Sequence, residues 1–300
     1  MIQALETEQL SKRYGRKWAL RNCTLHSPIG SITGLVGPNG AGKTTLLHLA
    51  MGLLVPTEGM IKVFGFHPGS QIQQILAKVG FVAQDHPLYK GFRVEEMLML
   101  GRKLNDIWDQ DQALRRLKHL NIPLHQPAGK LSGGQQAQVA LILALAKRPE
   151  LLLLDEPFAS LDPLARREFQ QTFMDAVADE GLSVIVSSHL VADLERFCDR
   201  LVILSASRVQ VANDVDTLLR SHKLLVGPRD RASTNSDSYT ILKSNESERQ
   251  CTLLVQIHRP IVDPAWEVCD VTLEEIILAY LAQPSEKLEA SETKKVEVRS

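Results

Sequence analysis

The sequence predicts an α/β protein in which helices cover both faces of a parallel sheet. Residues 31–36, 151–154 and 182–186 are short and continuously apolar. Such runs are typical of strands that are buried on both faces. A helix-like stretch at 43–54 follows the first run, and strands that alternate with helices indicate an α/β core.

The composition narrows the range of functions. The chain has 300 residues, of which 44% are hydrophobic and 23% charged, and its formal net charge is −1. These values are ordinary for a globular protein, and the near-neutral charge gives no reason to expect nucleic acid as a partner. The longest apolar run, 139–146, is far too short to cross a bilayer. Since the N-terminus also lacks a secretory signal, we expect a cytoplasmic location.

Changes in sequence character predict the domain organisation. Residues 1–220 carry the α/β pattern and form one predicted domain, and the helical, polar segment at about 87–145 is a predicted α-helical insertion within it. Residues 221–283 are a predicted small α+β extension. Residues 284–300 are charged and contain no aromatic side chain, so we expect a disordered tail.

Two elements are predicted within the extension. Residues 251–257 resemble a short strand. Residues 271–281 have the apolar spacing of an amphipathic helix. Thr272 and Glu275 stand at the positions of a capping box at the start of this helix.

A glycine-rich segment after the first apolar run predicts a phosphate-binding loop. The segment fits the pattern GxxxxGK[ST] and continues into a predicted helix; its residues are Gly37, Pro38, Asn39, Gly40, Ala41, Gly42, Lys43, Thr44 and the adjoining Thr45. Glycines let backbone N–H groups approach phosphate oxygens, and the helix start favours an anion. Lys43 would contact the β- and γ-phosphates, and the Thr44 hydroxyl would bind Mg²⁺. The alternative, a glycine turn without a ligand, does not explain why a predicted strand precedes the loop and a predicted helix follows it.

Two carboxylates directly follow the apolar run 151–154. They are Asp155 and Glu156. The carboxyl ends of parallel strands are where α/β sheets place their chemistry. Acidic residues are also common where a strand simply meets solvent. Beside a phosphate loop, however, we predict that Asp155 helps to hold Mg²⁺ and that Glu156 acts as general base on the attacking water.

A third motif separates this chain from other phosphate-loop ATPases. Residues 131–135 read LSGGQ, in which Ser132 and Gln135 have the spacing of a helix capping box. The motif resembles the signature of ATP-binding cassette proteins. That resemblance implies that Ser132, Gly133, Gly134 and Gln135 contact the nucleotide of an opposing subunit, so a single chain does not complete a site.

Four further residues are assigned by the same resemblance, which covers about residues 2–215. Tyr14 resembles the aromatic residue that stacks on adenine, and Gln84 resembles the glutamine that contacts Mg²⁺ and water. Asp162 resembles the loop residue at the dimer interface, and His189 resembles the histidine that contacts the γ-phosphate. Each also has a plainer explanation: a surface tyrosine, a loop glutamine, a helix cap and a structural histidine.

The chain departs from the family just after LSGGQ. The family often has basic residues there, whereas this sequence has Gln136, Gln138 and Leu143. The departure puts some charge contacts between subunits in doubt. It removes no predicted phosphate ligand.

The resemblance implies an ATP-hydrolysing subunit that uses ATP and Mg²⁺. Its implied partners are a membrane permease and a second ATP-binding subunit, with which it would form a homodimer on the cytoplasmic face of the membrane. The compact spacing from Gln84 to Leu131 and the short C-terminal extension resemble two-component exporters. Two alternatives are a soluble cassette ATPase in DNA repair or translation, and a regulatory cassette that binds ATP without hydrolysing it.

Overall fold

A computed structural model describes residues 2–229, 237–247, 250–261 and 263–283 of the chain. The predicted disordered tail at 284–300 lies outside these residues. In the part that is described, no helix has the length and apolar character needed to span a bilayer.

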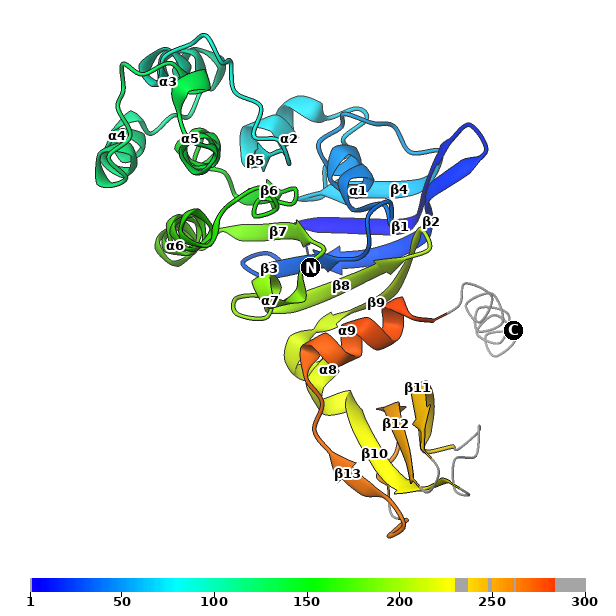
Figure 1. The fold of residues 1–300 in the computed structure, drawn as a ribbon. Coiled ribbons are helices and arrows are strands. Elements are labelled where there is room, and N and C mark those ends of the chain that lie inside the picture. Colours follow the sequence, from blue (N-terminus) through cyan, green and yellow to red (C-terminus); the bar gives the residue numbers. More distant parts are fainter. Residues whose placement is uncertain (1, 230–236, 248–249, 262, 284–300) are drawn as a thin grey trace.

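A six-stranded sheet forms the centre of the molecule (Figure 1). Its first five strands are parallel, and the last is antiparallel to its neighbour. In spatial order they are β5 (Val79–Val82), β6 (Leu151–Leu154), β7 (Ser183–Ser188), β3 (Ile32–Val36), β8 (Arg200–Ser205) and β9 (Arg208–Asp214). The three predicted apolar runs are strands β3, β6 and β7, and every residue of these strands is buried. This confirms the predicted α/β class.

One face of this sheet packs against a helix and a second sheet. The second sheet is antiparallel, in the order β2 (Lys17–Ser27), β1 (Leu5–Tyr14) and β4 (Glu58–Val63). Helix α1 (Lys43–Ala50) shares an apolar cluster with both sheets. The prediction that this helix reaches residue 54 is wrong, since Gly52 adopts a positive φ of 69° that ends the helical path. Helix α2 (Ile72–Lys78) leads into β5.

The other face of the central sheet packs against one long helix and two short ones. Helix α6 (Pro163–Glu180) contributes Phe169 and Phe173 to the main apolar cluster. The short helices α7 (Val191–Leu194) and α8 (Val215–Ser221) flank β8 and β9. Helices therefore lie on both sides of the central sheet, as the buried strands require.

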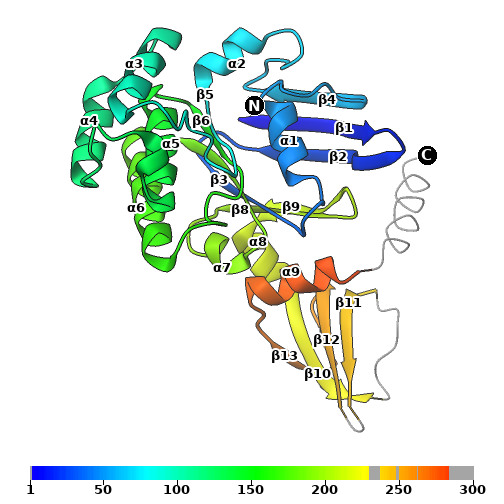
Figure 2. The ribbon, with the colours of Figure 1, turned by 45° about the horizontal axis from the view of Figure 1, so that its top comes forward.

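The helices inserted between β5 and β6 form a layer beside the core (Figure 2). They are α3 (Val94–Leu104), α4 (Gln110–His119), the 3-10 turn η1 (Ala128–Lys130) and α5 (Gly133–Ala146). Leu98, Leu117 and Ile142 belong to an apolar cluster of their own. Leu141 and Leu145 on α5 belong instead to the main cluster, so α5 joins the inserted helices to the core.

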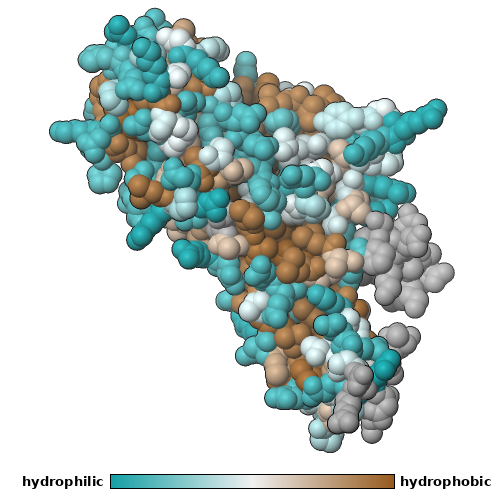
Figure 3. Space-filling view, in the orientation of Figure 1, coloured by the Kyte–Doolittle hydropathy of each residue, from teal (hydrophilic) through white to brown (hydrophobic). Residues whose placement is uncertain are grey.

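The C-terminal strands form a separate antiparallel sheet that projects from the core (Figure 1). In spatial order they are β11 (Tyr239–Glu246), β12 (Gln250–Ile257), β10 (His222–Pro228) and β13 (Glu267–Cys269). Helix α9 (Leu273–Leu281) then returns to the central sheet, where Ile276 and Ile277 join the main cluster. The predicted capping box at its start is confirmed, because Thr272 Oγ1 accepts from the Glu275 backbone N–H at 3.2 Å. Figure 3 shows apolar surface over β8 and α9, where the two parts meet.

Candidate nucleotide-binding site

The loop between β3 and α1 has a backbone that only glycine allows at several positions. Gly40 and Gly42 have φ angles of 81° and 108°, in the region that other residues rarely adopt. A Cβ atom on Gly37 would lie 2.2 Å from the backbone oxygen of Leu204. The glycines therefore determine both the shape of the loop and its close packing, which leaves its N–H groups near the start of α1.

Lys43, the first residue of α1, lies inside the loop with a side chain only 5% exposed. Its Nζ atom donates to the backbone oxygen of Gly37 at 2.7 Å. Nζ also lies 3.0 Å from Glu156 Oε1, although that oxygen has no partner with hydrogen-bond geometry among the described residues. The contact with Glu156 is therefore an ion pair. Lys43 places a positive charge where the loop would hold phosphate.

A hydroxyl between two strands positions both predicted carboxylates. Asp155 and Glu156 follow β6, and Ser187 lies near the end of the adjacent strand β7. Ser187 Oγ donates to Asp155 Oδ1 at 2.7 Å and accepts from the Glu156 backbone N–H at 2.8 Å. All three residues are buried. The sequence analysis did not assign Ser187, because serine at a strand end carries no signal of its neighbours across the sheet.

Glu156 is held between two partners in a strained backbone conformation. Its φ of 47° is left-handed, which costs a residue other than glycine about 1–2 kcal/mol. One oxygen faces Lys43, and the other, Oε2, lies 2.7 Å from His189 Nδ1. Oε2 also accepts from the His189 backbone N–H at 3.3 Å. The His189 side chain is 40% exposed, so it can reach a ligand while it contacts Glu156.

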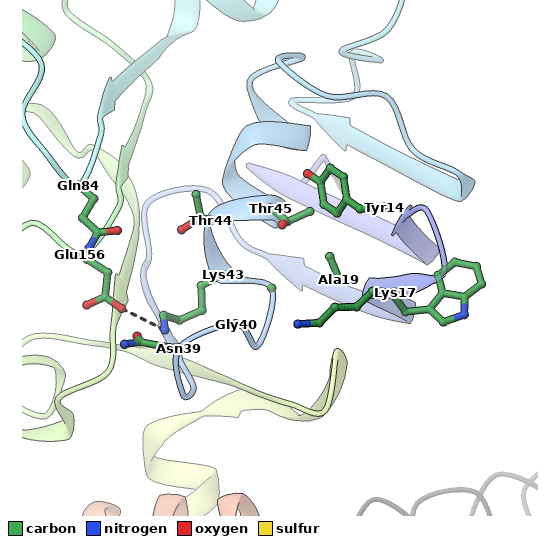
Figure 4. A pocket seen from close by; sticks show the side chains of 12 residues that line it. Tyr14, Lys17, Ala19, Asn39, Gly40, Lys43, Thr44, Thr45, Gln84 and Glu156 are labelled. Carbon is green, nitrogen blue, oxygen red and sulfur yellow. Dashed lines mark ion pairs between the residues drawn. The ribbon is translucent and has the colours of Figure 1, made fainter.

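A pocket of about 390 Å³ brings together nine of the predicted site residues (Figure 4). The predicted residues in its lining are Tyr14, Asn39, Gly40, Gly42, Lys43, Thr44, Thr45, Gln84 and Glu156. Lys17, Trp18 and Ala19 also line it and were not predicted. These three residues reach the pocket because β2 pairs with β1 next to Tyr14. No sequence motif predicts that strand pairing.

The signature residues do not reach this pocket. Ser132, Gly134, Gln135 and Asp162 line a different cavity, of about 170 Å³, and Gly133 is the first residue of α5. The capping box predicted there is confirmed: Ser132 Oγ accepts from the Gln135 N–H at 3.2 Å, and Gln135 Oε1 accepts from the Ser132 N–H at 3.1 Å. Asp162 caps α6 by accepting from two backbone N–H groups. Within one chain, the two sets of predicted ligands remain apart.

A glycine loop between a buried strand and a helix, with a buried lysine and carboxylates from neighbouring strands, defines the phosphate-loop nucleoside triphosphatases. The family model described as "ABC transporter" matches residues 20–159. The chain belongs to the family of ABC transporter ATP-binding proteins, whose members bind and hydrolyse ATP.

Individual relatives agree with this assignment. The ABC transporter ATP-binding protein YtrB of Bacillus subtilis (strain 168) is 28% identical over 92% of this chain and 97% of its own length. The phosphonates import ATP-binding protein PhnC of Thiobacillus denitrificans is 33% identical over 69% of this chain and 86% of its own. The bacitracin transport ATP-binding protein BcrA of Enterococcus faecalis is 30% identical over 68% of this chain and 67% of its own length.

Solved structures show the same fold. The structure of an ATP-binding subunit of an ABC transporter superposes with a TM-score of 0.66 at 28% identity, over 72% of this chain and 92% of the other. A dimeric ATP-binding cassette bound to ADP and phosphate gives a TM-score of 0.62 at 25% identity, over 70% of this chain and 98% of the other.

Proposed function

We propose that this chain is one of two identical ATPase subunits that power a membrane transporter whose permease is a separate polypeptide. The observation that carries the proposal is the separation of the signature cavity from the nucleotide pocket within one chain. If two chains pair head to tail, the signature of each covers the pocket of the other. The similar cassette that was solved as a dimer supports this arrangement.

The pocket lining fits a triphosphate with a divalent cation. The loop N–H groups and Lys43 receive the phosphates, and Tyr14, which is half exposed, stacks on the base. Thr44 and Gln84 of this lining, together with Asp155 directly after β6, would supply the oxygen atoms that Mg²⁺ prefers. The ion would neutralise charge on the phosphates. Glu156 accepts a proton from the attacking water, and His189 orients Glu156 and contacts the γ-phosphate.

The proposed permease contact lies on the segment that follows Gln84. Tyr89 and Phe92 are 65% and 41% exposed, and their rings pack together with centroids 5.2 Å apart. An exposed aromatic pair is unusual on a surface that meets only water, and aromatic residues are enriched in protein interfaces. We propose that this pair holds the chain to the permease at the cytoplasmic face of the membrane.

The proposed direction of transport is export. Relatives include a Nod factor export protein and bacitracin transport proteins, but also a phosphonates import protein. The short spacing from Gln84 to Leu131 and the small C-terminal extension favour the export group. An export role predicts that cells without the chain become more sensitive to at least one member of a panel of peptide antibiotics. Unchanged sensitivity, with impaired uptake of a nutrient, would contradict export.

The proposed domain division follows the apolar clusters. Residues 1–220 form the ATPase domain with the insertion at 87–145, and residues 221–283 form the extension. The separate cluster under β10–β12 supports this division. The packing of α9 into the main cluster indicates that the extension is fastened to the ATPase domain at its C-terminal end.

Membrane association tests the transporter role against the soluble alternative. The proposal expects the chain in the membrane fraction of its native cells and in the soluble fraction after Tyr89→Ser with Phe92→Ser. A matched control is Ile107→Ser, which changes another exposed apolar residue of the inserted segment. Copurification with nucleic acid and no membrane fraction would favour DNA repair or translation.

A further inference from the structure

The cavity beside the start of α5 contains a buried side-chain amide that has no hydrogen-bond partner in the described part of the chain. The cavity of about 170 Å³ lies between α5, the start of α6 and the turn after α4. Gln138 lines it and is only 3% exposed. Neither its Oε1 nor its Nε2 has a hydrogen-bond partner among the described residues. Because an unpaired buried amide is costly, this cavity suits an occupant that supplies hydrogen bonds.

The charges of the side chains that line the cavity indicate the charge of the group that would bind there. Asp162 and Glu168 line it, and no lysine, arginine or histidine is among the described residues of its lining. The Glu168 carboxylate has no ion pair or hydrogen bond with any residue that the structure describes, although the Glu168 backbone oxygen accepts from Thr172 Oγ1 at 3.0 Å. Two carboxylates and an amide oxygen in a lining that has no cation among its described residues favour a positively charged donor, such as a guanidinium or ammonium group.

We infer that the cavity receives a basic side chain from the β1–β2 hairpin of a second copy of this chain. The hairpin turns at Gly15 and Arg16, and Arg16 is exposed without a described partner. The next residue, Lys17, lines the nucleotide pocket. Arg16 and Lys17 are therefore adjacent exposed cations at the tip of the hairpin, and Lys17 borders that pocket.

The inference rests on the proposed head-to-tail pairing. In that pairing the nucleotide joins the phosphate loop of one copy to Ser132 and Gly134 of the other. Those two residues also border the Gln138 cavity, and the hairpin borders the nucleotide pocket. Closure of the dimer therefore brings the hairpin of each copy toward the cavity of the other. Two-fold symmetry forms the contact twice.

In the separated chain, water takes the place of the basic side chain in this cavity. The cavity is large enough for several water molecules, which are the partners available to Gln138 before closure. A basic side chain replaces them in the dimer and donates to Gln138 Oε1 and Glu168. The amide therefore contributes to association and not to the folding of a single chain.

Charge reversal in a slowly hydrolysing background tests the contact. The background is Glu156→Gln with ATP and Mg²⁺, and the dissociation constant of the dimer is measured by sedimentation equilibrium. Arg16→Glu and Glu168→Arg alone each raise this constant about tenfold, as expected for two lost charge contacts per dimer. The two reversals together restore it to within about threefold. The control Lys103→Glu, at an exposed site on α3, leaves it unchanged.

A near-isosteric change separates association from folding. Gln138→Met keeps the midpoint of thermal unfolding of the separated chain at or above the wild-type value, and it raises the dissociation constant of the dimer about tenfold. If the background variant dimerises but neither charge reversal alters the constant more than twofold, the inference is wrong. If the background variant stays monomeric at saturating nucleotide, the proposed pairing itself fails.

Discussion

At the scale of single residues, the buried carboxylate of Glu156 has a different partner at each of its two oxygens. Its two oxygens face Lys43 and His189, at 3.0 Å and 2.7 Å. Both partners are also candidates to contact the γ-phosphate. Arrival of the phosphate would draw Lys43 toward the new anion, and Glu156 would then be available to the attacking water. The left-handed backbone at Glu156 points the side chain into this gap.

Replacement of the proposed base should separate binding from turnover. Glu156→Gln keeps the shape of the side chain but cannot accept a proton from water. We expect the turnover number to fall by about 10²–10⁴-fold while ATP affinity is retained. Phosphate release measures the first quantity and equilibrium binding of labelled ATP the second. Turnover at the wild-type rate would show that another residue is the base.

Removal of one buried hydroxyl should affect metal use. Ser187→Ala removes the donor to Asp155 Oδ1 and the acceptor for the Glu156 N–H. Because Asp155 is a proposed Mg²⁺ ligand, we expect the Mg²⁺ concentration for half-maximal activity to rise and the turnover number to fall about tenfold. Ser188→Ala is the matched control, since the Ser188 hydroxyl hydrogen-bonds only to the backbone of Leu190 among the described residues. Equal effects of both changes would contradict the positioning role.

At the scale of elements, one buried hydrogen bond docks α9 on the rest of the fold. His222, the first residue of β10, is fully buried, and its Nε2 lies 3.0 Å from Tyr280 Oη on α9. His222 Nδ1 lies 2.8 Å from the Leu218 carbonyl, which can only accept. Nδ1 therefore carries a proton, and in the neutral ring Tyr280 Oη donates to Nε2. Burial lowers the pKa of His222 and raises the pKa of Tyr280 to about 12, which keeps both groups uncharged near neutral pH.

Loss of the tyrosine hydroxyl should weaken this docking. Tyr280→Phe leaves Nε2 of His222 buried without a donor, which costs about 1–3 kcal/mol of unfolding free energy. Urea denaturation at pH 7.5 measures this loss. Leu278→Ala, at a half-exposed site on the same helix, should cost less. An unchanged unfolding free energy in Tyr280→Phe would show that α9 docks by apolar contacts alone.

The same histidine predicts a dependence of stability on pH. Its pKa in the folded state is lowered from 6.5, so below about pH 6.5 the unfolded chain binds a proton more readily than the folded chain. The stabilising effect of the neutral histidine is therefore complete above the ordinary pKa and decreases as the pH falls. We expect the unfolding free energy to fall between pH 7.5 and pH 5.5, and less steeply in His222→Gln. Identical slopes for the two chains would contradict this role.

At the scale of the whole molecule, the proposed pairing predicts that activity requires association, because the proposed ligands lie in two separate cavities. Lys43, Thr44 and Glu156 line the nucleotide pocket, whereas Ser132, Gly134 and Gln135 line the other cavity. Specific ATPase activity should therefore rise with protein concentration until the dimer is saturated. Dilution series of the purified chain at constant saturating ATP measure this effect. A specific activity independent of concentration, together with a monomeric mass, would contradict the paired site.

The sequence by itself determined the fold class, the phosphate loop, the acidic pair after β6 and the signature, because each depends on local chemistry. Continuous apolar runs require a sheet covered on both faces, and glycines with a lysine at fixed spacing are needed to surround a phosphate. The tertiary structure alone decided which side chains meet across strands. Ser187 became a partner of Asp155 through the pairing of β6 with β7, and Trp18 entered the pocket through the pairing of β1 with β2. It also decided that the Gln138 amide is buried with no hydrogen-bond partner among the residues that the structure describes, since burial depends on the packing of α5 against helices distant in sequence.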